Sequence, residues 1–448
     1  MASDLLSIGR SGAQAARIAL DVTAQNIANA SSEGYVRRST RLEEVSSSGG
    51  YGRIGDVSLS GVRLDSVVRN ADLFRQSEVR RTGADAARAS AEVAGLENIE
   101  AAVEQSNVFP SIVAFEGSLQ QLAADPVDPS LRAAVIEDAR TMTRTFNIAA
   151  TSLDAVGTGL RFEATDGVEQ VGLLAGELSR VNLRLARAAD ASSDQTALLD
   201  QRDNLLEKLS GYVDVSTTIA ADHTVEVRLG GPTGDKLVEG GTAHAFAMSA
   251  ASDGTISFTL DGNAASPAAG SLAGKAQALV KLRDVHDRLD AVAKSVLDTV
   301  NAAQAGGITL GGAPGQPLFS GSATNVAATL ALAQEDGRGI ATAPPTGGAN
   351  SRDPANLSAL RTALATADPA GDMDALIFDI SGAVAGRSVT RDALGTIADT
   401  ARIALEAQSG VDLDQEAVNL VHFQQAFQAS GRVMQVASDL FDTLLAIK

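Results

Sequence analysis

Four histidines, His223, His244, His286 and His422, are the first residues to test for metal binding or acid–base chemistry near neutral pH. No two of them stand at metal-ligand spacing on one predicted helix. His422 lies beside a predicted apolar seam of the last helix, and we expect it to be solvated. The chain has no cysteine, which excludes thiol nucleophiles, disulfides and the usual structural zinc sites. The sequence therefore predicts no metal site.

Two glycine-rich segments resemble phosphate-binding loops but lack their spacing. Residues 230–236, Gly-Gly-Pro-Thr-Gly-Asp-Lys, do not have the G-x-x-x-x-G-K pattern and indicate a turn between strands. Residues 306–315 follow a predicted helix, whereas a dinucleotide loop follows a strand. Carboxylate pairs such as Glu43 and Glu44 indicate solvated surface, and no G-x-S-x-G elbow occurs. We predict no catalytic residue and no cofactor, because no acid, base and oxyanion site come together.

Composition narrows the class of protein further. The formal net charge of −19 and the absence of a Lys/Arg cluster argue against a nucleic-acid partner. Aromatic residues make up only 3% of the chain and tryptophan is absent, so small aliphatic side chains must fill the cores. Such cores favour long helices packed closely side by side. The longest uncharged stretch, residues 299–334, is broken by glycine and proline, and we expect no membrane insertion.

Both ends of the chain show the seven-residue spacing that is typical of coiled coils. At the amino end the first seam is small or aliphatic, and a companion seam holds Gly9, Ala16, Thr23 and Ala30. At the carboxyl end a seam of large side chains is flanked by a companion seam that contains Ser430 and Ala437. Large side chains can sit over small ones if the two helices pair, although two unrelated amphipathic helices fit the periodicity equally well. The candidate assembly residues are Leu6, Ala13, Leu20, Ile27, Leu413, Leu420, Phe423, Phe427, Met434, Phe441 and Leu444.

Signals for helix ends, strands and turns divide the rest of the chain. Asp412 is placed to cap the last helix with Gln415 three residues on, and Pro129 or Ser130 to start another. Alternating apolar residues and Asp-Gly pairs at 253–254 and 261–262 predict strands joined by turns. We predict a mainly α fold with a small β domain, elongated, with the terminal helices paired as a coiled coil at one end, a central helical bundle and a distal β domain. The predicted parts are a terminal assembly region (1–70 and 405–448, with an extended segment at 34–66), a helical bundle (71–211, 271–305 and 351–404), a small β domain (212–270) and a Gly/Pro-rich loop (306–350).

The two ends also carry motifs that resemble a known family. Residues 19–30, ending in Asn26-Ile27-Ala28-Asn29, and Gly34-Tyr35-Val36-Arg37 are similar to the amino-terminal signature of flagellar rod, hook and hook-associated proteins. Residues 409–448 resemble the matching carboxyl-terminal signature. The internal run Leu-Leu-Asp-Gln-Arg-Asp at 198–203 and the ending at 440–448 are similar to the flagellar hook-associated protein 1 family.

This resemblance implies a structural subunit that is not an enzyme. Members of the family are exported unfolded through the flagellar type III export apparatus and assemble at the hook–filament junction in a ring of about eleven subunits. The implied partners are the hook protein, the second junction protein, further copies of the chain and a cytosolic export chaperone at the C-terminal helix. The implied location is extracellular, on the bacterial flagellum, and cytoplasmic before export. Because isolated helices are marginal in water, we predict that the ends are disordered in the monomer.

Two other readings remain open. The first is another flagellar axial subunit, either the hook protein or the second junction protein. The second is a secreted surface binding protein or enzyme whose activity lies within residues 213–350. A deep pocket with converging polar groups in that region would favour it.

Overall fold

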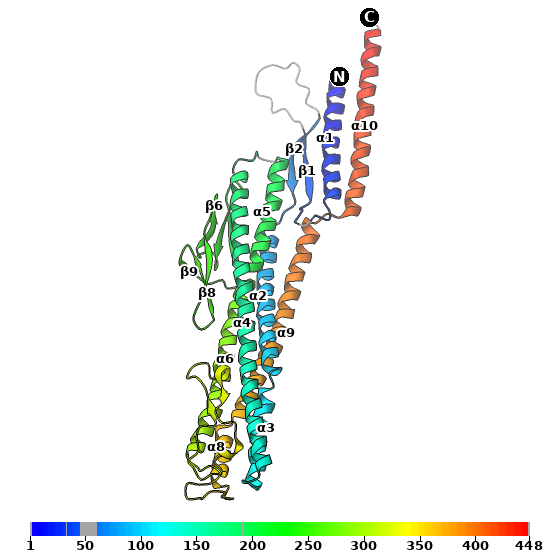
Figure 1. Ribbon diagram of the computed structural model, residues 1–448. Coiled ribbons are helices and arrows are strands. Elements are labelled where there is room, and N and C mark those ends of the chain that lie inside the picture. The colour runs from blue at the N-terminus through cyan, green and yellow to red at the C-terminus, as the bar shows by residue number, and fades with distance from the viewer. Residues whose placement is uncertain (1, 33, 45–60, 190–191, 447–448) are drawn as a thin grey trace. The chain divides into compact units, whose positions relative to one another are not determined.

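The computed structural model describes residues 2–32, 34–44, 61–189 and 192–446 of the chain (Figure 1). Its contacts group the chain into two compact units, each built from segments far apart in the sequence. Unit 1 comprises residues 1–84, 171–245 and 395–448, and unit 2 comprises residues 85–170 and 246–394. The predicted division into terminal region, bundle, β domain and loop stays a prediction, and the two units are described separately below.

Long helices dominate both units, as Figure 1 shows, and short strands make up the remainder. The predicted fold class, mainly α with a small β part, is confirmed. The helices are α1 (Ala2–Ala28), α2 (Leu73–Glu104), α3 (Val108–Ala124), α4 (Pro129–Leu185), α5 (Ser193–Tyr212), α6 (Ser271–Ala305), α7 (Val326–Thr329), α8 (Ala355–Ala367), α9 (Pro369–Ser409) and α10 (Leu413–Ala446). The strands are β1 (Arg38–Glu44), β2 (Val62–Arg69), β3 (Val215–Ile219), β4 (Val225–Leu229), β5 (Lys236–Glu239), β6 (Thr242–Ala243), β7 (Phe246–Ala250), β8 (Ile256–Leu260), β9 (Asn263–Ala265), β10 (Phe319–Ser320) and β11 (Ala331–Leu332).

Helix starts follow the capping residues that the sequence offers. The Asp412 carboxylate accepts hydrogen bonds from the backbone N–H groups of Asp414 (3.0 Å) and Gln415 (3.2 Å), as predicted for the start of α10. Helix α4 begins at Pro129, where its missing N–H costs nothing. Among the described residues, no helix is both long and apolar enough to cross a membrane.

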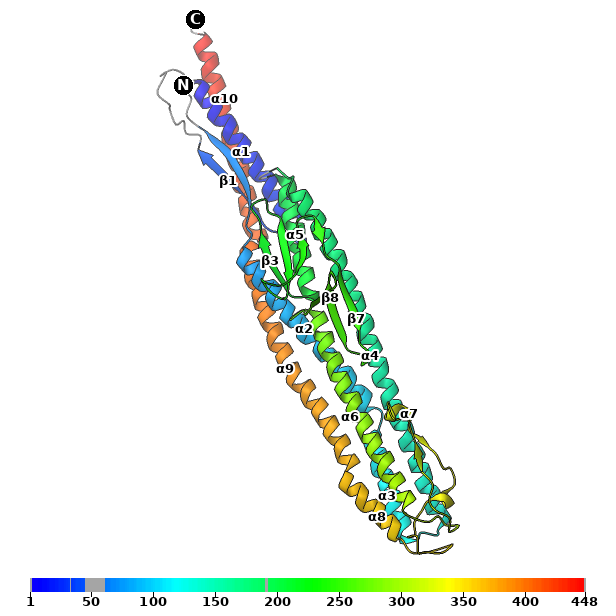
Figure 2. The ribbon, with the colours of Figure 1, turned by 90° about the vertical axis from the view of Figure 1, so that its left-hand side faces the viewer.

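In unit 1, α1 lies alongside α10 in both ribbon views (Figure 1, Figure 2). Strands β1 and β2 pair in an antiparallel hairpin that follows α1, with Arg38 opposite Arg69 in the register. Of the extended segment predicted at 34–66, residues 45–60 lie outside the described part of the chain. Unit 1 also holds an antiparallel sheet with strand order β3-β4-β5-β6.

The strands predicted between residues 213 and 262 are present, but they form two separate sheets. Strands β3 to β6 belong to unit 1, whereas β7, β8 and β9 form a second antiparallel sheet in unit 2. The turns at Asp253-Gly254 and Asp261-Gly262 are confirmed, with positive φ at Gly254 (81°) and Gly262 (83°). The turn predicted at 230–236 is also confirmed, because it joins β4 to β5.

The core of unit 2 lies between α2, α3, α4, α6, α8 and the start of α9. The Gly/Pro-rich segment 306–350 contains only short elements, and side chains from the helices hold it in place. The buried guanidinium of Arg132 donates to the carbonyls of Pro126 (2.6 Å), Gly337 (2.9 Å) and Ile340 (2.9 Å). The side-chain oxygen of Asn301 accepts from the backbone N–H groups of Leu318 and Phe319, and its NH2 group donates to the carbonyl of Phe319 (2.8 Å). Residues 306–350 are therefore held against the helices of unit 2, and they form a two-stranded sheet of their own, β10–β11.

Candidate assembly site

The terminal helices approach each other closely where α1 has glycine. A Cβ built on Gly9 would lie 2.7 Å from Cγ of Met434 and 3.1 Å from the backbone oxygen of Ser430. A Cβ built on Gly12 would lie 2.8 Å from Oγ of Ser430. A larger side chain at Gly9 would push the helices apart, because one of the two contacts is with backbone. The small amino-terminal residues are thus explained by close approach of α10.

The structure places the predicted seam residues in two groups. Ala13, Leu20, Leu420, Phe423 and Met434 are half-buried, whereas Leu6, Ile27, Leu413, Phe427 and Phe441 are exposed. The side chain of Leu444 lies outside the described set. On α1 the buried residues are those of the companion seam, Gly9, Ala16 and Thr23, together with Ala15, Ala19, Val22 and Asn26. The companion seam therefore faces α10, and the first seam lies along the edge of the contact. The role of all these residues in assembly stays a prediction.

A buried carboxylate, Glu416, joins the end of α1 to the start of α10. Its residue is only 1% exposed. Oε1 accepts from Nε of Arg37 at 2.7 Å, and Oε2 accepts from Nδ2 of Asn26 at 3.2 Å. Asn26 Oδ1 in turn accepts from the hydroxyl of Tyr35 (2.9 Å) and the backbone N–H of Arg38 (3.0 Å). We call Asn26, Arg37 and Glu416 the Glu416 node.

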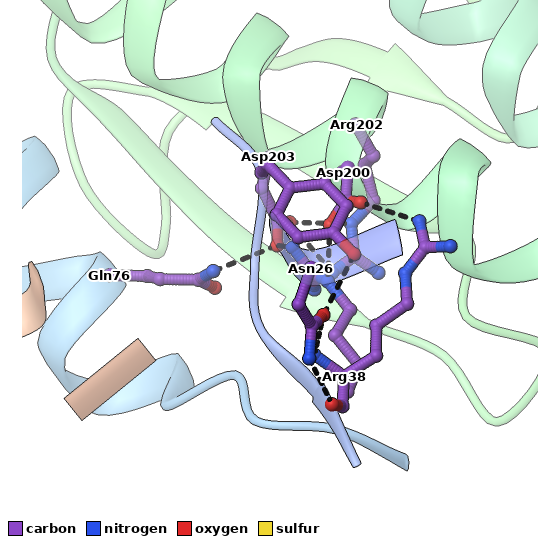
Figure 3. Close-up of polar contacts among 8 residues, drawn as sticks. Asn26, Arg38, Gln76, Asp200, Arg202 and Asp203 are labelled. Atoms are coloured by element: carbon purple, nitrogen blue, oxygen red, sulfur yellow. Dashed lines mark hydrogen bonds and ion pairs between the residues drawn. The ribbon is translucent and has the colours of Figure 1, made fainter. Parts of the chain in front are cut away.

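A second group of ionised side chains fixes the base of the β1–β2 hairpin to α5 (Figure 3). Asp200 accepts from Nη2 of Arg38 at 3.0 Å and from Nε of Arg69 at 2.6 Å. Asp203, one turn further along α5, lies 2.7 Å from Nη2 of Arg69 and accepts from Nε2 of Gln76 at 2.9 Å. We call Arg38, Arg69, Asp200 and Asp203 the hairpin clamp. It binds both strands of the hairpin at the register pair where they begin and end.

Arg202 completes the electrostatics of the hairpin clamp. Its buried guanidinium donates to Oδ1 of Asp203 (2.9 and 2.8 Å) and to the carbonyl of His223 (2.9 Å). Burial alone would raise the pKa of Asp203, but the charges and hydrogen bonds of Arg69 and Arg202 outweigh it and hold that pKa below its ordinary value. Asp203 is therefore ionised at neutral pH.

Sequence reasoning noted Asn26 and the 198–203 run as motifs but missed what they bind. Asp200 and Asp203 are three residues apart, which puts them on one face of α5. Leu198, Leu205 and Leu206 are buried on the other side and anchor that helix. Two carboxylates on one helical face, next to a buried arginine, are a signal of an ion-pair cluster. The local sequence pattern does not indicate which distant side chains these carboxylates bind.

Unit 2 has a cleft of about 580 Å³, the feature that the binding-protein or enzyme reading requires. Several of its charged groups are already paired with one another. His286 Nε2 lies 3.2 Å from Asp154 Oδ1, and Arg283 Nη1 lies 3.0 Å from Asp253 Oδ2. These pairs tie the β7–β8 turn and α4 to α6. Within the described part of the chain, no cluster of three or more His, Asp or Glu side chains is arranged to hold a metal ion.

Comparisons with protein families match most of the chain. A model described as "Flagellar hook-associated protein FlgK helical domain" matches residues 93–319. A model described as "Flagellar basal body rod FlgEFG protein C-terminal" matches residues 405–447, and one described as "Flagella basal body rod protein" matches residues 6–35. The two rod-protein matches cover the paired terminal helices.

Individual relatives give the same picture. The chain is 24% identical to flagellar hook-associated protein 1 of Bacillus subtilis over 496 residues, which cover 98% of this chain and 97% of the relative. It is 23% identical to the protein of that name from Escherichia coli over the full length of both. It is 28% identical to the protein of that name from Salmonella typhimurium over 250 residues, 55% of this chain and 44% of the relative. Among solved structures, the flagellar hook junction protein FlgK from Burkholderia pseudomallei aligns with a TM-score of 0.49 and 24% identity over 55% of this chain and 47% of that chain.

Proposed function

Because the chain belongs to the family of flagellar hook-associated protein 1, whose helical-domain model spans more than half of it, we propose that it is the adaptor that joins hook to filament. The family is one of structural proteins of the bacterial flagellum. The protein would lie at the hook–filament junction and would assemble there through its terminal helices.

The observation that carries this proposal is the apolar surface that α1 leaves uncovered on α10. Phe427 and Phe441 are exposed on it together with Leu413, Val418, Val421, Val433, Val436 and Leu440, which are spread around the helix and do not follow a single stripe. So many exposed large apolar side chains on one helix mark a protein–protein interaction site. Helix α1 covers only one side of α10, so neighbouring subunits are needed to remove the rest from water. A tube built from terminal helices supplies such neighbours on every side.

We further propose the partners that the family resemblance implies. The exposed faces of α1 and α10 would be covered by further copies of the chain in a ring of about eleven. The hook protein would cover them on the hook side, and the second junction protein on the filament side. A cytosolic chaperone that covers the apolar face of α10 would prevent aggregation before export through the type III apparatus. After export the protein would be extracellular, at the hook–filament junction.

Replacing Phe427 with Asp tests the role of the α10 face. Phe427→Asp should abolish attachment of filaments to hooks, because a charge would be buried without a partner in the assembled tube. The measurement is electron microscopy of hooks together with immunoblotting of the growth medium, where the unassembled protein should accumulate. Phe427→Leu, which keeps an apolar side chain at the same position, is the matched control and should assemble normally. Filaments of ordinary length on the hooks of the Phe427→Asp strain would refute the proposed site.

A further inference from the structure

Two of the most exposed phenylalanines among the described residues belong to unit 2. Phe162 on α4 is 75% exposed and Phe378 on α9 is 77% exposed. Single exposed apolar residues are common and need no explanation. These two, however, each belong to a longer face whose members recur at helical spacing.

The outer face of α4 runs through Arg144, Ile148, Ala155 and Phe162, which follow one another at intervals of four, seven and seven residues. All four are exposed, and this spacing places them along one side of the helix. Gly159 lies among them, and a Cβ built there would meet nothing within 4 Å. A glycine inside an exposed helix costs about 1 kcal/mol relative to alanine, and no packing within unit 2 explains it.

The outer face of α9 has the same layout. Asp374, Phe378, Ala385 and Val389 follow at intervals of four, seven and four residues, and all four are exposed. Gly382 lies among them, again with nothing within 4 Å of a built Cβ. Arg144 on the α4 face and Asp374 on the α9 face stand four residues before Ile148 and Phe378 respectively. Both side chains are exposed, and among the described residues neither takes part in an ion pair.

Both faces turn away from the same core. On α4, Leu153 and Leu160 point into unit 2, and on α9, Leu376 and Ile380 do so. In Figure 2, α4 and α9 form opposite edges of this part of the molecule, with α6 between them. The two faces therefore cannot meet within one chain.

The two faces also lie at nearly the same height in unit 2. Asp154 of α4 pairs with His286 of α6, and Arg288 of α6 pairs with Asp379 of α9 at 2.7 Å. Residues 286 and 288 are only about 3 Å apart along α6. Since α4 and α9 both run antiparallel to α6, the positions of Ile148 and Phe378 along the direction of the helix axes agree to within about two helical turns.

We propose that the outer face of α4 in one copy of the chain docks on the outer face of α9 in a second copy. Ile148 then lies against Phe378, Ala155 against Ala385, and the Arg144 guanidinium beside the Asp374 carboxylate. Val389 packs over the space left by Gly159. The contact is heterologous, because it joins two different faces, so each copy offers one face to each neighbour and a closed ring can form. This inference rests on the proposed assembly of several copies, and names the surface that joins them outside the terminal helices.

Cross-linking tests the docking directly, because the chain has no cysteine of its own. Flagella assembled from the Ala155→Cys, Ala385→Cys double variant, treated with a short bis-maleimide, should yield a ladder of dimers, trimers and higher multimers. Each single cysteine variant should give none, because neither residue meets its own counterpart. Assembled flagella without a ladder, or with dimers from a single cysteine variant, would overturn the α4–α9 contact while leaving the proposed function intact. Absence of the wild-type protein from hooks would instead count against the proposed function.

Charge reversal tests the same contact without cysteines. Arg144→Glu and Asp374→Arg should each lower the amount of protein retained on hooks by about tenfold, because like charges then face one another. The Arg144→Glu, Asp374→Arg double variant should restore it, since the pair is re-formed in the opposite sense. Phe378→Ser should weaken retention, whereas Phe74→Ser should not, because Phe74 on α2 is equally exposed (79%) but lies on neither face. Absence of rescue in the double variant would overturn the assignment.

Discussion

At the scale of single residues, unit 1 buries ionised groups whose contribution to folding stability depends on their partners. Asp203 is nearly enclosed and is matched by Arg69 and Arg202. Replacing one member of such a pair leaves the others buried and uncompensated, at a cost of about 3–5 kcal/mol. While it is intact, such a pair adds little net stability, since desolvation offsets most of the attraction.

Asp203→Asn should therefore loosen α5, with a defined dependence on pH. The pKa of Asp203 is lowered in the folded chain, so its contribution is full above the ordinary carboxyl pKa of about 4 and is lost as pH falls through the lower, folded value. Amide hydrogen exchange of α5 should be faster in the variant at pH 7, and the difference should shrink below about pH 4. Asp65→Asn, at an exposed position of β2, is the control. Equal α5 protection in wild type and Asp203→Asn at pH 7 would contradict the role given to the hairpin clamp.

At the scale of elements, the register of α1 against α10 can be measured with an engineered disulfide. A Cβ built on Gly12 would lie 3.6 Å from Cβ of Ser430, within the usual disulfide span of about 3.5–4.5 Å. In assembled flagella the Gly12→Cys, Ser430→Cys variant should oxidise to an intramolecular disulfide. Gly12→Cys with Ala437→Cys, one heptad further along, should not. Equal oxidation of both variants in flagella would mean that the helices do not hold the register of the structure.

Several elements could be predicted from local pattern alone. The capped start of α10 at Asp412, the start of α4 at Pro129 and the full extent of α6 at residues 271–305 all match the structure. These are short-range signals, in which a residue satisfies backbone groups one turn away. The sheets could not be predicted in the same way. Alternating residues locate strands but not their partners, and β6 and β7 lie in different sheets although only two residues separate them.

The two polar clusters were beyond sequence reasoning for a related reason. Arg38 and Asp200 are 162 residues apart, and Asn26 and Glu416 are 390 apart. Glu416 has a local explanation as an acidic residue in the first turn of a helix. Its burial and its bond to Arg37 depend on where α1 and the hairpin come to lie. The amino-terminal seam illustrates the same limit, because spacing alone did not show that the Gly9 companion seam faces α10.

At the scale of the whole molecule, we predict that the monomer is ordered unevenly. Residues 2–28 and 413–446 should exchange their amide hydrogens at nearly unfolded rates in the purified monomer, because the apolar face of α10 lacks the neighbours that would bury it. Helix α6, in the core of unit 2, should be strongly protected in the same sample and serves as the internal control. Protection of α1 and α10 at a concentration where the protein is monomeric would show that the terminal helices fold before assembly.

The hairpin clamp also bears on how this sequence can change over evolutionary time. Arg38 and Arg69 depend on the same Asp200, although they belong to different strands of the hairpin. Loss of Asp200 leaves the largely buried Arg38 without its carboxylate, so substitutions at these distant positions should be inherited together rather than one by one. In an alignment of relatives, residues 38, 69 and 200 should covary, as should residues 37 and 416. The exposed residues Pro232 and Thr233 of the β4–β5 turn should vary independently of these positions.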